Sequence, residues 1–182
     1  MLAHARVGAI EVLGRRLLVL IGRQLWVSDG TNVGTQLVRT FPGTRELREP
    51  RSLLANAAGT EAYFWAEDLA ALWKTDGTTV GTVRLKYVRA SQGSLFRRSP
   101  WQLVRLNGVV VFVGKDAAHG EELWRTDGTP AGTRLVRDFV PGPESSFPGL
   151  SPEAVVGGVL YFSGVGLGTG FELWRTDGTP AG

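Results

Sequence analysis

The residues of this chain with the types and spacing for chemistry are mostly acidic and lie in two short segments. Glu67 and Asp68 stand in one segment, and Asp116, His119 and Glu121 stand in the other. Two carboxylates about 5 to 10 Å apart can hydrolyse a glycosidic bond between them. A histidine with two carboxylates can ligate a metal ion. These five residues are therefore candidates for a binding or catalytic surface.

The case for catalysis or metal binding at these residues is weak. One histidine and two carboxylates on a single loop are explained as well by an ordinary solvated loop. No nucleophile, base or known catalytic motif accompanies the acids. The chain has no cysteine, which excludes disulfides, thiol catalysis and cysteine metal ligands. We therefore expect no catalytic residue and no metal site.

Two other features bear on ligands. Trp65 and Trp101 lie near loop ends, where a tryptophan can stack on a sugar or cover the core, and the core role is the favoured interpretation. The glycines of GVGLGTG (164–170) fail the dinucleotide-binding pattern and do not open a helix. We expect no phosphate site and no cofactor.

Charge and hydropathy exclude two further classes of partner. The chain of 182 residues has 20 basic and 17 acidic side chains, and no basic run is longer than the pairs Arg15-Arg16 and Arg97-Arg98. A nucleic-acid groove needs a denser basic stripe. The apolar run LLVLI (17–21) is too short for a signal peptide or a membrane span. We expect no nucleic-acid binding, no membrane insertion and no signal peptide in this chain.

A repeated segment positions the candidate residues. ELWRTDGTPAG occurs at 122–132 and again at 172–182, with looser copies QLWVSDGTNVG at 24–34 and ALWKTDGTTVG at 71–81. The tryptophans are in register at spacings of 47, 51 and 50 residues, and lie at Trp26, Trp73, Trp124 and Trp174. A period near 50 residues is typical of propeller blades.

Each repeat contains the signals of four strands. Upstream of the motif, QLVRLNGVVVFVG (102–114) and EAVVGGVLYFSG (153–164) read as two strands joined by Asn-Gly or Gly-Gly turns. The Leu-Trp segment is the third strand, and TRLVRDF (133–139) with its counterparts is the fourth. The pattern predicts a four-stranded antiparallel meander in each repeat.

Leu123 and Trp124 indicate how these sheets pack. Successive strand residues face opposite sides, and both residues are large and apolar, so both faces must be covered. We predict an all-β, propeller-like array of about 3.75 four-stranded blades in one repeat domain, 1–182, with blades at 7–41, 52–88, 101–139 and 152–182. A two-sheet sandwich is the alternative fold, but it predicts alternating rather than two-sided apolar patterning.

The repeated polar residues have a structural explanation. An Asp before Gly can accept hydrogen bonds from backbone N–H groups two residues on, and Gly can adopt positive φ. One carboxylate per blade cannot converge on a single calcium ion. We therefore expect structural roles for the repeat positions, with the tryptophans packing between blades: Trp26, Asp29, Gly30, Thr31, Trp73, Asp76, Gly77, Thr78, Trp124, Asp127, Gly128, Thr129, Trp174, Asp177, Gly178 and Thr179.

The motif at 122–138 resembles the ELWxxDGT repeat family of bacterial proteins. The resemblance is specific in the third and fourth copies and weaker in the first two, where Gln24 and Ala71 replace the leading Glu. The resemblance implies a bacterial tandem-repeat protein that is extracellular or displayed at the cell surface. It implies no activity.

Meander topology predicts two distinct ends for each blade. The Asp-Gly-Thr turns lie at one end, and the most varied links lie at the other, where a recognition surface is usually built. The sequence therefore predicts a non-catalytic binding module for a protein or glycan, with Trp65, Glu67, Asp68, Trp101, Asp116, His119 and Glu121 as candidate contacts. The alternative is a glycoside hydrolase or lyase that uses carboxylates among Glu67, Asp68, Asp116, Glu121 and Glu144.

The fourth repeat stops before its fourth strand. Gly182 aligns with Gly132, after which the third repeat continues into TRLVRDF. An unpaired strand edge invites association. A fragment of a longer protein, closure by oligomerisation and a strained ring all explain this pattern. We expect a fragment, with self-association through open blade edges as a further expectation.

Overall fold

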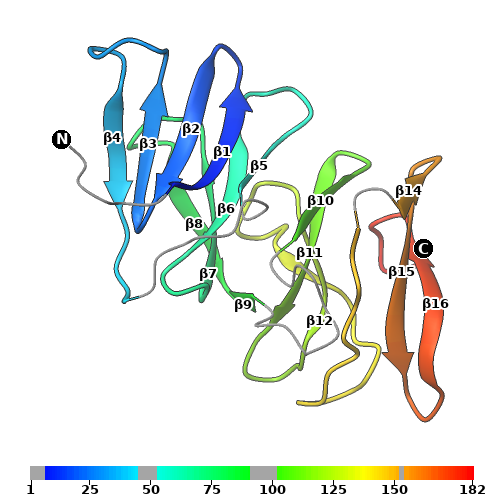
Figure 1. Ribbon diagram of the computed structural model, residues 1–182. Coiled ribbons are helices and arrows are strands. Elements are labelled where there is room, and N and C mark those ends of the chain that lie inside the picture. The colour runs from blue at the N-terminus through cyan, green and yellow to red at the C-terminus, as the bar shows by residue number, and fades with distance from the viewer. Residues whose placement is uncertain (1–6, 45–52, 91–101, 152–153) are drawn as a thin grey trace. The chain divides into compact units, whose positions relative to one another are not determined.

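The computed structural model describes residues 7–44, 53–90, 102–151 and 154–182. The chain forms two compact units, residues 1–86 and 87–182. Each unit contains two antiparallel sheets, which Figure 1 colours from blue to green in the first unit and from green to red in the second. The predicted all-β class and antiparallel meander are confirmed.

The first unit holds sheets 1 and 2. Sheet 1 has the order β1-β2-β3-β4, formed by Val7–Leu13, Arg16–Ile21, Gln24–Ser28 and Gln36–Thr40. Sheet 2 has the order β5-β6-β7-β8, formed by Leu53–Ala55, Ala62–Ala66, Ala71–Thr75 and Val83–Tyr87. In both sheets the Leu-Trp motif forms the third strand.

The second unit holds sheets 3 and 4. Sheet 3 has the order β10-β11-β12-β13, formed by Leu103–Leu106, Val109–Lys115, Glu122–Thr126 and Arg134–Arg137. Sheet 4 has the order β14-β15-β16, formed by Val155–Val156, Val159–Gly166 and Gly170–Thr176. Within the described residues, no strand pairs with the outer edge of β16.

Sheet 3 contains one strand that the sequence did not predict. β9 (Arg89–Ala90) pairs with the end of β11, where Gly114 lies opposite Ala90. β10 reaches only as far as Phe112 on this edge of β11. The extra strand therefore pairs backbone groups that β10 leaves exposed.

Two-residue turns join the first two strands of sheets 3 and 4. Asn107 and Gly108 have φ of 48° and 81°, and Gly157 and Gly158 have φ of 58° and 77°. Positive φ at both central positions is the hairpin geometry that Asn-Gly and Gly-Gly favour. The predicted turns are therefore correct.

The outermost strands pair with the Leu-Trp strand through a bulge. Trp26 lies opposite Leu37 while Leu25 lies opposite Arg39, and the register shifts between the two pairs. Sheet 3 repeats this shift between Leu123 and Trp124. A bulge adds a residue to one strand and increases the local twist.

A phenylalanine after the outermost strand connects neighbouring sheets. Phe41 follows β4 and packs edge-on against Phe64 and Trp73 of sheet 2, with ring centroids 5.3 and 5.0 Å away. Phe139 follows β13 and packs in the same way against Phe162 and Trp174 of sheet 4, at 5.8 and 5.0 Å. Each unit therefore contains the same aromatic junction between its two sheets.

Candidate functional site

The repeated Asp-Gly-Thr segments form hydrogen-bonded turns. In the third copy, Asp127 Oδ1 accepts from the N–H and the hydroxyl of Thr129 at 2.9 and 2.7 Å. Gly132 N–H donates to Thr129 Oγ1 at 2.9 Å. The hydroxyl and N–H of Thr129 lower the pKa of Asp127. Asp29 and Asp76 accept the same two bonds from Thr31 and Thr78.

The glycine that ends each motif has a steric role that the sequence analysis missed. A Cβ at Gly132 would overlap the carboxylate of Asp127, and Gly34, Gly81 and Gly182 meet their own aspartates in the same way. The sequence contains a signal for this steric role, because all four copies of the motif end in glycine. The aspartate and this glycine therefore form one structural unit.

Side chains of the first hairpin turns contact these Asp-Gly-Thr turns. Asn107 Nδ2 donates to Gly158 O at 2.7 Å and to Asp177 O at 3.1 Å. In the first unit, Arg16 Nη2 donates to Asp76 O at 2.9 Å. The first hairpin turns and the Asp-Gly-Thr turns of neighbouring sheets therefore lie at the same end, as meander topology requires.

At the opposite end of the first unit, Glu67 and Asp68 form a strained turn between β6 and β7. Glu67, Asp68 and Leu69 have φ of 56°, 57° and 66°, a left-handed conformation that costs roughly 1–2 kcal/mol per residue. Glu67 Oε1 accepts from Arg84 Nη1 at 3.1 Å. The Asp68 carboxylate accepts from Thr44 N–H at 2.8 Å. Glu67 therefore attaches this turn to β8, and Asp68 attaches it to the residues that follow β4.

At the same end of the second unit, Asp116 closes the loop between β11 and β12. Asp116 Oδ1 accepts from the N–H groups of Ala118 and His119 at 2.9 Å each, and lies 2.8 Å from His119 Nδ1. Burial acts to raise the pKa of Asp116, but the bonds from His119 and Ala118 outweigh it and the pKa is lowered. Asp116 and His119 therefore pair with each other and stabilise the loop.

The link 141–151 is attached to that loop through backbone groups. Gly120 N–H donates to Gly142 O at 3.2 Å, and a Cβ at Gly120 would overlap the carbonyl of Glu144. On the other side of the link, Val165 N–H donates to Ser146 O at 2.6 Å. The link is therefore ordered between the β11–β12 loop and β15.

Glu122, the first residue of the third motif, is a buried carboxylate that the sequence analysis did not single out. Its oxygens accept from Phe139 N–H at 3.2 Å, Ser146 N–H at 3.1 Å and Ser146 Oγ at 2.6 Å. Burial raises its pKa and nearby Asp138 adds to the rise, against the opposing effect of these bonds. Glu122 therefore fixes both the end of β13 and the link that follows.

The remaining candidates are dispersed. Trp65 is fully buried, which agrees with the favoured core role and leaves its ring unable to stack on a sugar. Glu121 is half-buried, and its Oε2 has no hydrogen-bond partner within the described residues. Glu144 is exposed. Trp101 lies outside the described residues.

Among the described residues, the candidate acids form no cluster that could hold a metal ion. Within residues 7–44, 53–90, 102–151 and 154–182, no three His, Asp or Glu side chains are arranged to hold a metal ion. Asp116 is engaged by His119 of its own loop, Glu67 by Arg84 of β8, and Asp68 by Thr44, which follows β4. The described segments also contain no helix with the length and hydropathy to cross a membrane.

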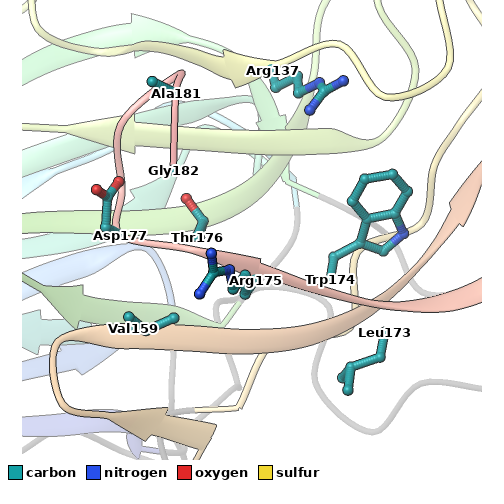
Figure 2. Close-up of a pocket in the computed structure, with 9 residues that line it drawn as sticks. All are labelled: Arg137, Val159, Leu173, Trp174, Arg175, Thr176, Asp177, Ala181 and Gly182. Atoms are coloured by element: carbon teal, nitrogen blue, oxygen red, sulfur yellow. The ribbon is translucent and has the colours of Figure 1, made fainter.

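A groove of about 430 Å³ follows the outer edge of β16. Its lining comes from β13, β15, β16 and the final turn, and includes Arg137, Trp174, Thr176 and Gly182. Figure 2 shows Trp174 pointing to the side where Arg137 lies and Leu173 pointing to the opposite side. Leu173 is 77% exposed. The groove therefore combines an unpaired strand edge with apolar and cationic side chains.

Comparison with known proteins identifies the architecture. No protein-family model and no curated protein matches the sequence. The β-propeller domain of Myceliophteria thermophila Cps50 (Swd1) matches with a TM-score of 0.50 at 15% identity, over 94% of this chain and 54% of that chain. A putative 6-phosphogluconolactonase from Bacteroides fragilis matches with a TM-score of 0.43 at 14% identity, over 89% of this chain and 48% of that chain.

The first match establishes the fold and nothing about activity, because its identity is only 15%. The chain spans about half the length of these two solved structures. Its four antiparallel sheets correspond to blades of a β-propeller. The predicted propeller-like architecture is confirmed, and this chain is a β-propeller module.

Proposed function

We propose that this β-propeller module is non-catalytic and binds a protein or a glycan through the loops opposite the Asp-Gly-Thr turns. The observation that carries the proposal is the ordered surface made by the β11–β12 loop and the link 141–151. Gly120, Ser146 and Glu122 fix these two segments together through hydrogen bonds. Rigid loops on a sheet scaffold are a common location for recognition.

The same contacts favour binding over catalysis. Asp116 and Glu122 both accept hydrogen bonds that hold loops, which favours structural roles for these two carboxylates. A glycosidase needs two carboxylates at about 5 to 10 Å across the scissile bond. A location at a bacterial cell surface, which the repeat resemblance implies, belongs to this proposal.

The test uses a double variant that alters exposed residues without removing a loop hydrogen bond. Ala117→Arg with Glu144→Lys changes the proposed surface, and Val80→Arg changes an Asp-Gly-Thr turn at the opposite end, where Val80 is 90% exposed. On a glycan array, we expect binding that the double variant loses and Val80→Arg retains. A reducing-sugar assay on the bound glycan should show no product.

Three results would contradict parts of this proposal. Release of reducing sugar that Glu121→Ala abolishes would show a glycan-cleaving enzyme. Failure of the wild-type chain to bind any glycan would remove the glycan part and leave a protein ligand. Equal loss of binding in Val80→Arg and the double variant would place the contact surface elsewhere.

A further inference from the structure

Glu122 and Ser146 meet in a buried polar contact, where the link 141–151 reaches the start of β12. Both side chains are buried, and Glu122 has no exposed surface. Its carboxylate accepts from the N–H groups of Phe139 and Ser146 and from the Ser146 hydroxyl, all of which are uncharged. Burial of an ionised carboxylate is unfavourable unless a cation or strong hydrogen bonds compensate for it. Within the described residues, an ionised Glu122 therefore has hydrogen bonds but no cation.

Ser146 has too few donor protons for the acceptors around it. Its hydroxyl oxygen lies 2.6 Å from Glu122 Oε2 and 3.2 Å from Glu121 O. Its N–H is shared in the same way, at 3.1 Å from Glu122 Oε1 and 3.1 Å from Glu121 O. A serine hydroxyl has one proton, so two acceptors compete for it. One further donor proton at this position would satisfy both acceptors at once.

A proton on Glu122 Oε2 supplies that donor. Oε2–H can donate to Ser146 Oγ, and the Ser146 hydroxyl is then free to donate to Glu121 O. Glu122 Oε1 still accepts from Ser146 N–H. The separation of 2.6 Å between Oε2 and Oγ lies within the range of an O–H···O hydrogen bond. The proton comes from the solvent, and no other covalent bond forms or breaks.

The charged groups around Glu122 also favour its protonated form. Burial raises the pKa of Glu122, and the negative charge of Asp138 adds to the rise. The other ionisable side chains of the adjoining segments are Asp116, His119 and Glu121 in the β11–β12 loop, Glu144 in the link, Lys115 in β11, Arg89 in β9 and Arg137 in β13. The three basic residues among them, Lys115, Arg89 and Arg137, are exposed, and no described basic side chain forms an ion pair or a hydrogen bond with Glu122.

We propose that Glu122 takes up a proton in the folded protein at mildly acidic pH, and that this proton strengthens the attachment of the link 141–151 to β12. Ser146 extends the effect to sheet 4, because its carbonyl accepts from Val165 N–H at 2.6 Å. Further along the link, Gly149 N–H donates to Ser163 O at 2.7 Å. The protonation state of one buried carboxyl therefore controls how firmly the link joins sheets 3 and 4.

The direction of the pH dependence follows from the two states of the link. In a detached state Glu122 is hydrated and has its ordinary pKa of 4.5, whereas in the attached state its pKa is raised. The attached state therefore binds the proton more tightly. The added stability is fully present below pH 4.5 and is lost as the pH rises through the raised value. We expect the link to be held more firmly at pH 5 than at pH 8.

This pH dependence bears on the surface named under the proposed function. The link is one of the two segments of that surface, so the proton on Glu122 would make the surface more rigid in acid. This consequence for ligand binding rests on the proposed function. The attachment of the link does not rest on it and is measured without a ligand, so failure of the chain to bind a glycan leaves the inference about Glu122 unaffected.

Hydrogen–deuterium exchange of the 182-residue chain, followed by mass spectrometry between pH 5 and pH 8, tests the inference. After correction for the intrinsic exchange rate, protection of segment 139–149 should fall with rising pH, by up to about 10-fold for each unit by which the pKa is raised. Glu122→Gln keeps an acceptor and has an amide donor at every pH. The protection of this variant should therefore be independent of pH.

Three matched variants assign the effect to Glu122. Asp138→Asn removes the nearby negative charge, so the midpoint of the pH dependence should move to lower pH. Histidine side chains take up a proton in the same pH range, and His119→Gln should nevertheless retain the full pH dependence. Glu172→Gln, at the same motif position in sheet 4, changes an exposed carboxylate and should also retain it.

Four results would overturn the inference. Protection of the wild-type segment 139–149 that does not change between pH 5 and pH 8 would show that no proton is linked to the attachment. Equal pH dependence in Glu122→Gln and the wild type, or its loss in His119→Gln, would assign the proton to another residue. An unchanged midpoint in Asp138→Asn would do the same, and this variant decides the matter where Glu122→Gln does not fold.

Discussion

At the scale of single residues, the motif positions act through backbone contacts. The leading Glu122 binds Phe139 and Ser146 of the following link, whereas Glu172, at the same motif position in sheet 4, is exposed. Asp127 and Gly132 build the turn. The structural role of Glu122 therefore depends on its contacts with the link that follows β13.

Replacing Glu122 tests that dependence. Glu122→Ala should lower the free energy of unfolding by about 1–3 kcal/mol, because the buried N–H groups of Phe139 and Ser146 lose their acceptor. Urea unfolding followed by tryptophan fluorescence measures the change. Glu172→Ala is the matched control and should change stability by less than about 0.5 kcal/mol. Equal effects of the two variants would contradict the assigned role.

The Asp-Gly-Thr turns should respond to acid. Hydrogen bonds from Thr129 lower the pKa of Asp127 below its ordinary value of 3.8. A lowered pKa in the folded state stabilises the fold above pH 3.8, and this contribution is lost as the pH falls through the folded value. The Asp127→Asn variant keeps a side-chain oxygen that can accept the bonds from Thr129, but it has no carboxylate to protonate. At pH 7 we therefore expect Asp127→Asn to melt somewhat below the wild type, which alone has the stabilising ionised carboxylate.

Below about pH 4, the melting temperature of the wild type should fall more steeply than that of Asp127→Asn, because only the wild type loses an ionised acceptor. Thermal melts followed by circular dichroism between pH 2 and pH 7 give both curves. Parallel curves over the whole range would show that the turn does not depend on the ionised carboxylate.

At the scale of elements, the aromatic junction between sheets is a packing contact that recurs in both units. Phe41 and Phe139 make the same edge-on contacts in the two units. Val88 stands at the corresponding sequence position after β8, and a Cβ at Gly114 would meet its side chain at 2.7 Å. The position after the fourth strand is therefore apolar wherever it is described.

Phe139→Ala should remove this junction from the second unit. We expect a loss of about 2–4 kcal/mol in the free energy of unfolding, because a large ring is deleted from contact with Phe162 and Trp174. Phe171→Ala is the control, since Phe171 is 66% exposed. Chemical denaturation measures both, and a loss as large in Phe171→Ala would refute the assigned role of Phe139.

The sequence predicted the strands well because they repeat. The shared Leu-Trp and Asp-Gly-Thr segments, with the Asn107-Gly108 and Gly157-Gly158 turns, indicate the meander from the sequence alone. It did not predict β9, because a two-residue strand carries no periodicity. The left-handed turn at Glu67 is held by tertiary contacts, which local patterns do not contain.

At the scale of the whole molecule, the chain has two compact units, and each contains a buried hydrophobic cluster. The buried cluster that extends from Ala9 to Trp73 lies wholly in the first unit, and the cluster that extends from Val104 to Trp174 lies wholly in the second. Repeat proteins derive stability from each repeat and from its nearest neighbours. Two sheets with one aromatic junction are therefore a candidate folding unit.

Expression of residues 1–86 alone tests this idea. We expect a β-sheet circular dichroism spectrum and a cooperative thermal transition, because the core from Ala9 to Trp73 is complete in this segment. Phe41→Ala in the same segment should lower the transition temperature. A disordered spectrum for the unaltered segment would show that the first unit requires the second.

The contact made by Asn107 also has a chemical consequence over time. Asn-Gly sequences are prone to deamidation, which turns the amide into a carboxylate, and asparagine is among the thermolabile residues. The amide of Asn107 donates to the carbonyls of Gly158 and Asp177, whereas a carboxylate can only accept. Deamidation of Asn107 would therefore convert an attraction between sheets 3 and 4 into a repulsion. The stability of the protein during storage thus depends in part on one side-chain amide.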